Sequence, residues 1–103
     1  MPSHGYEAIV GRVMATGNAR GGEASGVQFE VDAGPPLRVA FPQPGGIIDN
    51  WEGVVWDPTD VVRSATGWRD GTYTASPVAK ALFGGDLVAC RHVIDHFYRC
   101  WFT

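Results

Sequence analysis

The chain has little of what marks a nucleic-acid-binding, membrane-spanning or secreted protein. Lys80 is the sole lysine, the seven arginines are scattered, and the formal net charge is −3. Nucleic-acid binding relies on clustered positive charge that neutralises phosphates, so we predict no nucleic-acid partner. No segment approaches the roughly 20 apolar residues of a membrane helix, and residues 1–8 do not resemble a signal peptide. We therefore expect a cytoplasmic protein with no membrane attachment.

Cysteine is scarce as well, since Cys90 and Cys100 are the only two. Two cysteines cannot form the disulfide framework of many small secreted proteins, and in the cytoplasm we expect structural thiols. A cross-strand disulfide stays open as the alternative if the two residues lie opposite each other. A zinc site needs three or four ligands, and His92, Asp95 and His96 do not converge on a strand and its turn. The sequence predicts no metal and no cofactor.

What the chain does contain is apolar and aromatic. Hydrophobic residues make up 45% of it, and four tryptophans, three tyrosines and five phenylalanines are present. This content is sufficient for residues 1–103 to form a single domain with one core.

Several segments before residue 77 have strand patterns, and turn residues separate them. Residues 27–32 and 37–41 alternate apolar and polar side chains around a Gly-Pro-Pro turn, which predicts a hairpin. Residues 6–16 also alternate and would extend this hairpin to a three-stranded meander, while the glycine-rich residues 17–26 read as a mobile loop. Residues 51–56 predict a strand covered on both faces, and residues 61–64 a returning strand after the turn at 57–60.

The C-terminal third predicts a short helix and a second hairpin. Ser76 suits the N-cap, Pro77 the first helical position and Gly84 the end, which places the helix at about residues 77–83. Residues 87–103 form two strands about a three-residue loop at 94–96. The sequence ends within the second strand, so that strand is either central in its sheet or has a covered edge.

Counting back from that loop gives the register of the terminal hairpin. Cys90 falls opposite Cys100 and His92 opposite Tyr98, on a largely apolar face. The other face would hold four residues: Ala89, Arg91, Arg99 and Trp101. Together these elements predict an α+β, β-dominated fold, with a curved or barrel-like antiparallel sheet of about six to seven strands and one short helix.

No catalytic residues are predicted. A cysteine–histidine nucleophile would need an oxyanion loop, and none precedes Cys90. Asp49, Glu52, Asp57 and Asp60 surround one strand–turn unit, and solvated turn carboxylates explain them better than an acid–base pair.

An aromatic side chain next to charge in a loop fits a ligand or partner contact. Trp68 lies in such a loop beside Arg69, with Tyr73 close in sequence. We take Trp68, Arg69, Tyr73 and Trp101 as the candidate contact residues.

Two stretches resemble a group of known proteins. They are residues 49–59 (DNWEGVVWDPT) and 82–103 (LFGGDLVACRHVIDHFYRCWFT). Both look like small uncharacterised bacterial proteins of the kind carried on mobile integron gene cassettes. The resemblance implies a compact α+β accessory protein and assigns no functional residues.

The expected function is a non-enzymatic protein–protein interaction or accessory protein that self-associates through its sheet, with a homodimer as the favoured homo-oligomer. The alternative is a small-molecule binding module whose tryptophan-lined pocket lies under residues 67–75. A small hydrolase-like enzyme ranks third, because no nucleophile–base pair or metal cluster has suitable spacing.

Overall fold

The computed structural model describes residues 4–17, 20–24, 26–34, 36–43, 51–65, 67–69, 72–73, 82–84 and 87–102. Its elements are α1 His4–Thr16, β1 Gly22–Ala24, β2 Val27–Asp32, β3 Arg38–Pro42, β4 Trp51–Trp56, η1 Val61–Ser64, β5 Trp68–Arg69, β6 Thr72–Tyr73, η2 Leu82–Gly84, β7 Leu87–Ile94 and β8 Phe97–Phe102. The η elements are short 3-10 helices.

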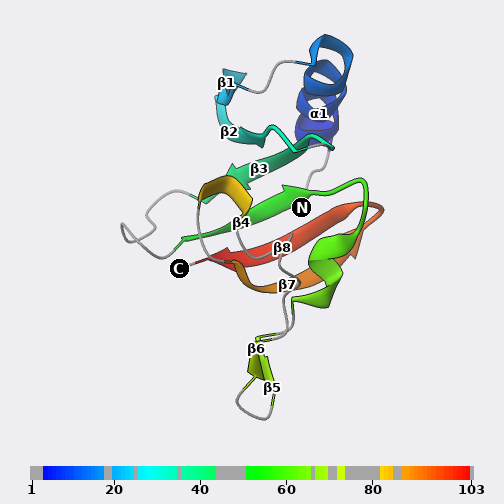
Figure 1. Cartoon of the computed structure of the whole chain (residues 1–103). Coiled ribbons are helices and arrows are strands. Elements are labelled where there is room, and N and C mark those ends of the chain that lie inside the picture. Colours follow the sequence, from blue (N-terminus) through cyan, green and yellow to red (C-terminus); the bar gives the residue numbers. More distant parts are fainter. Residues whose placement is uncertain are drawn as a thin grey trace.

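Six strands form one antiparallel sheet in the order β1-β2-β3-β4-β8-β7 (Figure 1). β5 and β6 pair separately as a two-stranded sheet. The predicted α+β class with a curved antiparallel sheet is confirmed, and the sheet is open rather than closed into a barrel. None of the helices described is both long enough and apolar enough to cross a membrane.

The first element contradicts the sequence prediction. Residues 6–16 were expected to form a strand, but His4–Thr16 is an α-helix. Its inward side chains are Tyr6, Ile9, Val10 and Val13, which follow the i, i+3, i+4, i+7 spacing of a helix face. The meander predicted at this end is instead completed by β1, from within the glycine-rich segment.

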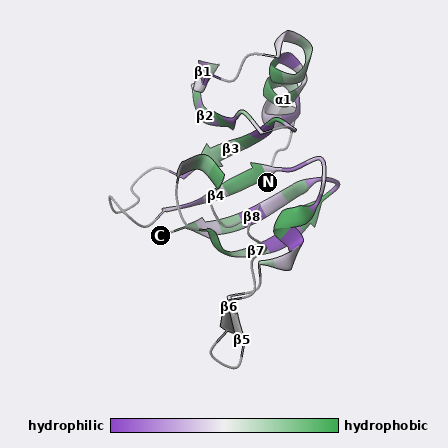
Figure 2. Cartoon of the chain, viewed as in Figure 1, coloured by the Kyte–Doolittle hydropathy of each residue, from purple (hydrophilic) through white to green (hydrophobic). Residues whose placement is uncertain are grey.

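The sheet has two faces, and each carries its own core. On one face α1 packs against β2, β3 and β4, where Tyr6 stacks on Phe41 with ring centroids 4.0 Å apart. On the other face η1 and η2 cover β4, β8 and β7, in a cluster that includes Tyr98, Cys100 and Phe102. Figure 2 shows apolar residues along β3 and β4, which, like β8, contribute to both cores.

The central strand and the turn after it largely follow the prediction. Val54 and Val55 are both buried, so β4 is covered on both faces as expected. The turn at residues 57–60 is present, but residues 61–64 form η1 rather than a returning strand. Most of the helix predicted at 77–83 lies outside the described residues. Leu82–Gly84 form a 3-10 turn in which Phe83 has a positive φ of 57°.

The terminal hairpin keeps the predicted register in its middle. Cys90 pairs with Cys100 and His92 with Tyr98, but the turn contains two residues, because Ile94 rather than Val93 lies opposite Phe97. The register shifts between Leu87 and Ala89 and between His92 and Ile94, so the pairing departs from the predicted register at both ends of the hairpin. β8 lies between β4 and β7, so it is central and its edge needs no further cover.

Candidate functional site

The sheet face of β4, β8 and β7 that α1 leaves uncovered presents a group of exposed side chains. Cross-strand partners point to the same side of a sheet, as do residues two apart on one strand. The pairs Glu52–Trp101, Trp101–Ala89 and Arg99–Arg91 therefore share this face, as predicted for the hairpin residues. We call the exposed residues of this region the hairpin surface: Glu52, Arg91, Val93, Ile94, Arg99 and Trp101.

The hairpin surface contains most of the large apolar side chains that the described chain exposes. Val93 is 44% exposed, Ile94 49% and Trp101 36%. Among the residues that the structure describes, Met14 on α1, at 45%, is the other large hydrophobic residue exposed to this degree. Exposed apolar residues that gather in one region are typical of a contact surface, whereas single ones are ordinary.

Charged groups on this surface are incompletely balanced. The Arg99 Nη2 atom lies 2.9 Å from Glu52 Oε2, and the Arg99 guanidinium lies 5.9 Å from the Trp101 ring centroid. Arg91 is the cross-strand partner of Arg99, and like charges in that position repel. Within the described residues no carboxylate pairs with Arg91. A partner that brings negative charge to Arg91 would relieve this repulsion.

The free edge of β7 is less available for contact with a partner than its exposed face. The Cys90 amide donates a hydrogen bond of 2.7 Å to the Ala65 carbonyl, so the chain after η1 covers the middle of the edge. The two register shifts also make the strand irregular, which hinders pairing with another strand. Contact through the face therefore fits this structure better than strand addition at the edge.

The four predicted contact residues lie in two different sheets. Trp68 pairs with Tyr73 and Arg69 with Thr72 in the β5–β6 hairpin, which projects away from the main sheet (Figure 1). The side chains of these predicted residues lie outside the described part of the chain. Trp101 belongs to the main sheet, on the hairpin surface.

The turn after β4 holds a buried ion pair between Asp57 and Arg38. Asp57 was expected to be solvated, but it is fully buried and accepts a hydrogen bond of 2.9 Å from Arg38 Nε. Its carboxylate also accepts the amides of Thr59 and Val62 and the Thr59 hydroxyl. Arg38, 3% exposed, further donates to Thr59. All these groups satisfy one another, so we read the cluster as structural.

A second polar group connects the turn after β4 to the turn of the terminal hairpin. The Tyr98 hydroxyl donates to Asp60 Oδ1 at 2.6 Å, and His96 Nδ1 lies 3.0 Å from the same oxygen. Hydrogen bonds from Tyr98 and His96 lower the pKa of Asp60 below its usual value. Burial, with the hydrogen bond to Asp60, raises the pKa of Tyr98 to about 12. These contacts of Asp60 with His96 and Tyr98 join the two turns.

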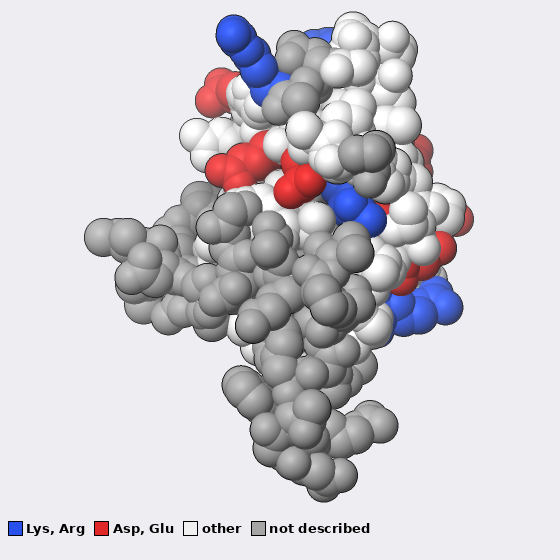
Figure 3. All heavy atoms as spheres, viewed as in Figure 1, with Lys and Arg blue, Asp and Glu red and all other residues white. Residues whose placement is uncertain are grey.

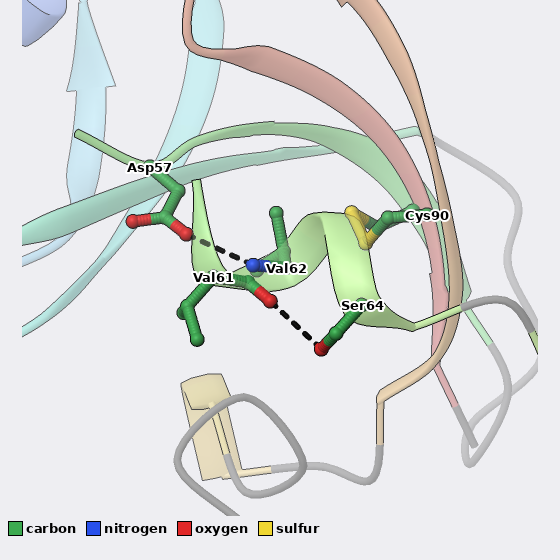
Figure 4. Close-up of a disulfide and its surroundings, with 6 residues drawn as sticks. Asp57, Val61, Val62, Ser64 and Cys90 are labelled. Carbon is green, nitrogen blue, oxygen red and sulfur yellow. Dashed lines mark hydrogen bonds between the residues drawn. A yellow bond between two sulfur atoms is a disulfide. The ribbon is translucent and has the colours of Figure 1, made fainter. Parts of the chain in front are cut away.

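The two cysteines are joined in a disulfide, where thiols had been expected (Figure 4). The register explains the difference, because it brings their Cα atoms to 4.1 Å across two adjacent strands. Cys100 is fully buried, Cys90 is partly buried, and the bridge lies beside η1. In the same view Asp57 accepts the Val62 amide and Ser64 donates to the Val61 carbonyl.

A groove of about 830 Å³ lies between the glycine-rich segment, β2 and Phe83. Glu23, Glu30 and Asp32 contribute to its lining. The part of the chain that the structure describes has no group of three or more metal-ligating side chains, here or elsewhere. This groove is not the predicted tryptophan-lined pocket, whose loop falls largely outside the described residues.

Charges of both signs are distributed over the molecule. On the side shown in Figure 3, the basic side chains lie apart from one another, with acidic ones between them. No protein-family model matches the chain, and no curated protein or solved structure is similar enough to count as a match. The resemblance to integron-cassette proteins thus stays a prediction.

Proposed function

We propose that the chain is a non-enzymatic interaction protein that forms a homodimer through the hairpin surface. The observation that carries this proposal is the exposure of Ile94 and Trp101 on either side of the Arg91–Arg99 pair, on a sheet face that α1 leaves open, with Val93 exposed next to Ile94. Aromatic and arginine side chains are enriched at protein interfaces. The sequence also predicts self-association through the sheet.

Charge complementarity favours a second copy as the partner. A two-fold axis places the same patch of both copies face to face. Arg91 has no acidic partner within its own described chain, and Glu52 is the sole carboxylate on this face of the fully described strands β4, β8 and β7. In a two-fold dimer Arg91 of each copy would meet Glu52 of the other, and both repulsive arginine pairs would gain a counter-charge.

The other two functions have less support. Binding of a small molecule under residues 67–75 stays a prediction, which ligand-dependent tryptophan fluorescence would test. A small hydrolase-like enzyme would need a nucleophile near the Asp60–His96 pair. The cytoplasmic location is likewise a prediction. A reducing compartment would oppose the Cys90–Cys100 bridge.

The molar mass in solution tests the proposal. We expect light scattering on the eluting protein to give about twice the 11.1 kDa mass of one chain at micromolar concentration. Trp101→Ala should shift the protein toward monomer, because it removes the aromatic residue of the surface. Met14→Ala serves as the control, since Met14 is a large apolar residue on α1 that is 45% exposed, against 36% for Trp101. A wild-type monomer at high micromolar concentration would refute the proposal.

A further inference from the structure

The disulfide ties β7 to β8 at a point where their backbones are not hydrogen-bonded. The Cys90 amide donates to Ala65, away from β8, so Cys90 and Cys100 form a non-hydrogen-bonded pair. Register shifts on both sides of this pair limit the regular pairing of the two strands to residues 89–92 of β7. The backbone hydrogen bonds of such a short ladder contribute little to keeping β7 on the sheet.

The side chains around the bridge differ sharply in burial. Cys100, like Tyr98, belongs to the core cluster and is fully buried. Cys90 is only partly buried, and the residues from Arg91 to Ile94 are exposed. Leu87 anchors the first end of β7 in the core. The middle of β7 is thus held by the bridge, the short ladder and the Cys90–Ala65 hydrogen bond, and its far end by the two-residue turn into β8.

We infer that the Cys90–Cys100 bridge is a redox lock that a dithiol reductant opens to release β7 from the sheet. A thiolate of the reductant attacks the Cys90 sulfur, the Cys90–Cys100 bond breaks, and Cys100 leaves as a thiolate that takes up a proton. The second thiol of the reductant then attacks the mixed disulfide and frees Cys90. The protein gains two electrons and two protons, and the reductant becomes a disulfide.

Release of β7 would alter the hairpin surface. β7 contributes Arg91, Val93 and Ile94, so its displacement removes both apolar and charged parts of that surface. This step rests on the proposed homodimer. In that case only the oxidised protein associates. β8 would at the same time lose the strand that protects its edge.

Hydrogen exchange measured by mass spectrometry tests the lock directly on the wild-type chain. Dithiothreitol is the reductant, and a mass increase of two hydrogens confirms the reduction. We expect amide exchange in residues 87–94 to become at least about tenfold faster, while α1 keeps its protection. Cys90→Ala/Cys100→Ala is the control, and its exchange should not respond to dithiothreitol.

Two results would overturn the inference. One is unchanged exchange of β7 on reduction. The other is equal loss of protection in α1 and β7, which would mean global unfolding. Sedimentation of both redox forms separates this claim from the proposed function. A monomer in both forms, combined with faster β7 exchange on reduction, would refute the homodimer and leave the redox lock standing.

Discussion

At the scale of single residues, Asp57 and Arg38 show how a buried charge pair can organise a turn. The carboxylate of Asp57 receives four hydrogen bonds from Arg38, Thr59 and Val62. Without this carboxylate, each donor would be wholly or partly removed from water with no hydrogen-bond partner, which would lower the stability of the folded state. The pair therefore defines the path of the chain from β4 into η1.

Removing one member of this pair should destabilise the protein strongly. Asp57→Ala leaves the buried Arg38 guanidinium without its counter-charge, and we expect the free energy of unfolding to fall by about 3–5 kcal/mol. Urea denaturation measures the change. The double substitution Arg38→Met/Asp57→Leu is the control, because it removes both charges and should be closer to wild type. Equal losses for the single and the double variant would contradict this account.

The Tyr98–Asp60 hydrogen bond predicts a dependence of stability on pH at both extremes. The pKa of Tyr98 is raised to about 12, so its contribution is complete below the ordinary value of 10.0 and is lost as the pH rises through 12. The pKa of Asp60 is lowered, so its contribution is present above the ordinary value of 3.8 and is lost as the pH falls through the lowered value.

Tyrosinate absorbance, measured as a function of pH, tests the prediction for Tyr98 at alkaline pH. The difference between wild type and Tyr98→Phe reports Tyr98 alone, and we expect this tyrosine to stay un-ionised at pH 11 in the folded protein. A midpoint near pH 10 in folded protein would show that burial and the hydrogen bond to Asp60 do not raise the pKa of Tyr98. Circular dichroism at each pH checks that the protein remains folded.

Residue-level prediction from sequence succeeded where register alone decides the outcome. The placement of Arg91, Arg99 and Trp101 on one face followed from counting along the hairpin. The role of Glu52 could not be found in this way, because it depends on the pairing of β4 with β8, which are 40 residues or more apart. Burial of Asp57 likewise depends on Arg38, 19 positions away in sequence.

At the scale of elements, α1 shows that one sequence pattern can fit both a strand and a helix. Residues 6–16 contain enough apolar side chains to satisfy both a period of two and a helical face. The helix is favoured because it buries Ile9, Val10 and Val13 against the sheet. The terminal hairpin is easier to predict from sequence, because two apolar strands and a short turn restrict the pairing to a few registers.

A pair of glycine substitutions tests the assignment of these elements. Gly11 lies in α1 with open space around it, so Gly11→Ala should raise the free energy of unfolding by up to about 1 kcal/mol. Gly53 lies on β4, where an added Cβ would approach the Phe41 carbonyl oxygen to 2.4 Å. Gly53→Ala should therefore lower that free energy, by about 1–3 kcal/mol. Thermal denaturation distinguishes the two, and a destabilising Gly11→Ala would argue against the helix.

At the scale of the whole molecule, the sheet is covered unevenly. One face has η1 and η2 over β4, β8 and β7, and the other has α1 over β2, β3 and β4. This leaves the hairpin surface open opposite the disulfide-containing core. The overall class was predictable from strand patterns and turn residues. The uneven coverage was not, because it depends on where the misjudged helix packs.

The most direct test of the central claim uses two charge-reversal variants, Arg91→Glu and Glu52→Arg. In a two-fold dimer each variant alone places like charges opposite each other, so both should be monomeric. An equimolar mixture restores opposite charges at both contacts and should form a heterodimer, seen by sedimentation as a doubling of mass. Circular dichroism confirms that each variant is folded. If the mixture stays monomeric, or if either variant alone dimerises as wild type does, association through the hairpin surface is contradicted.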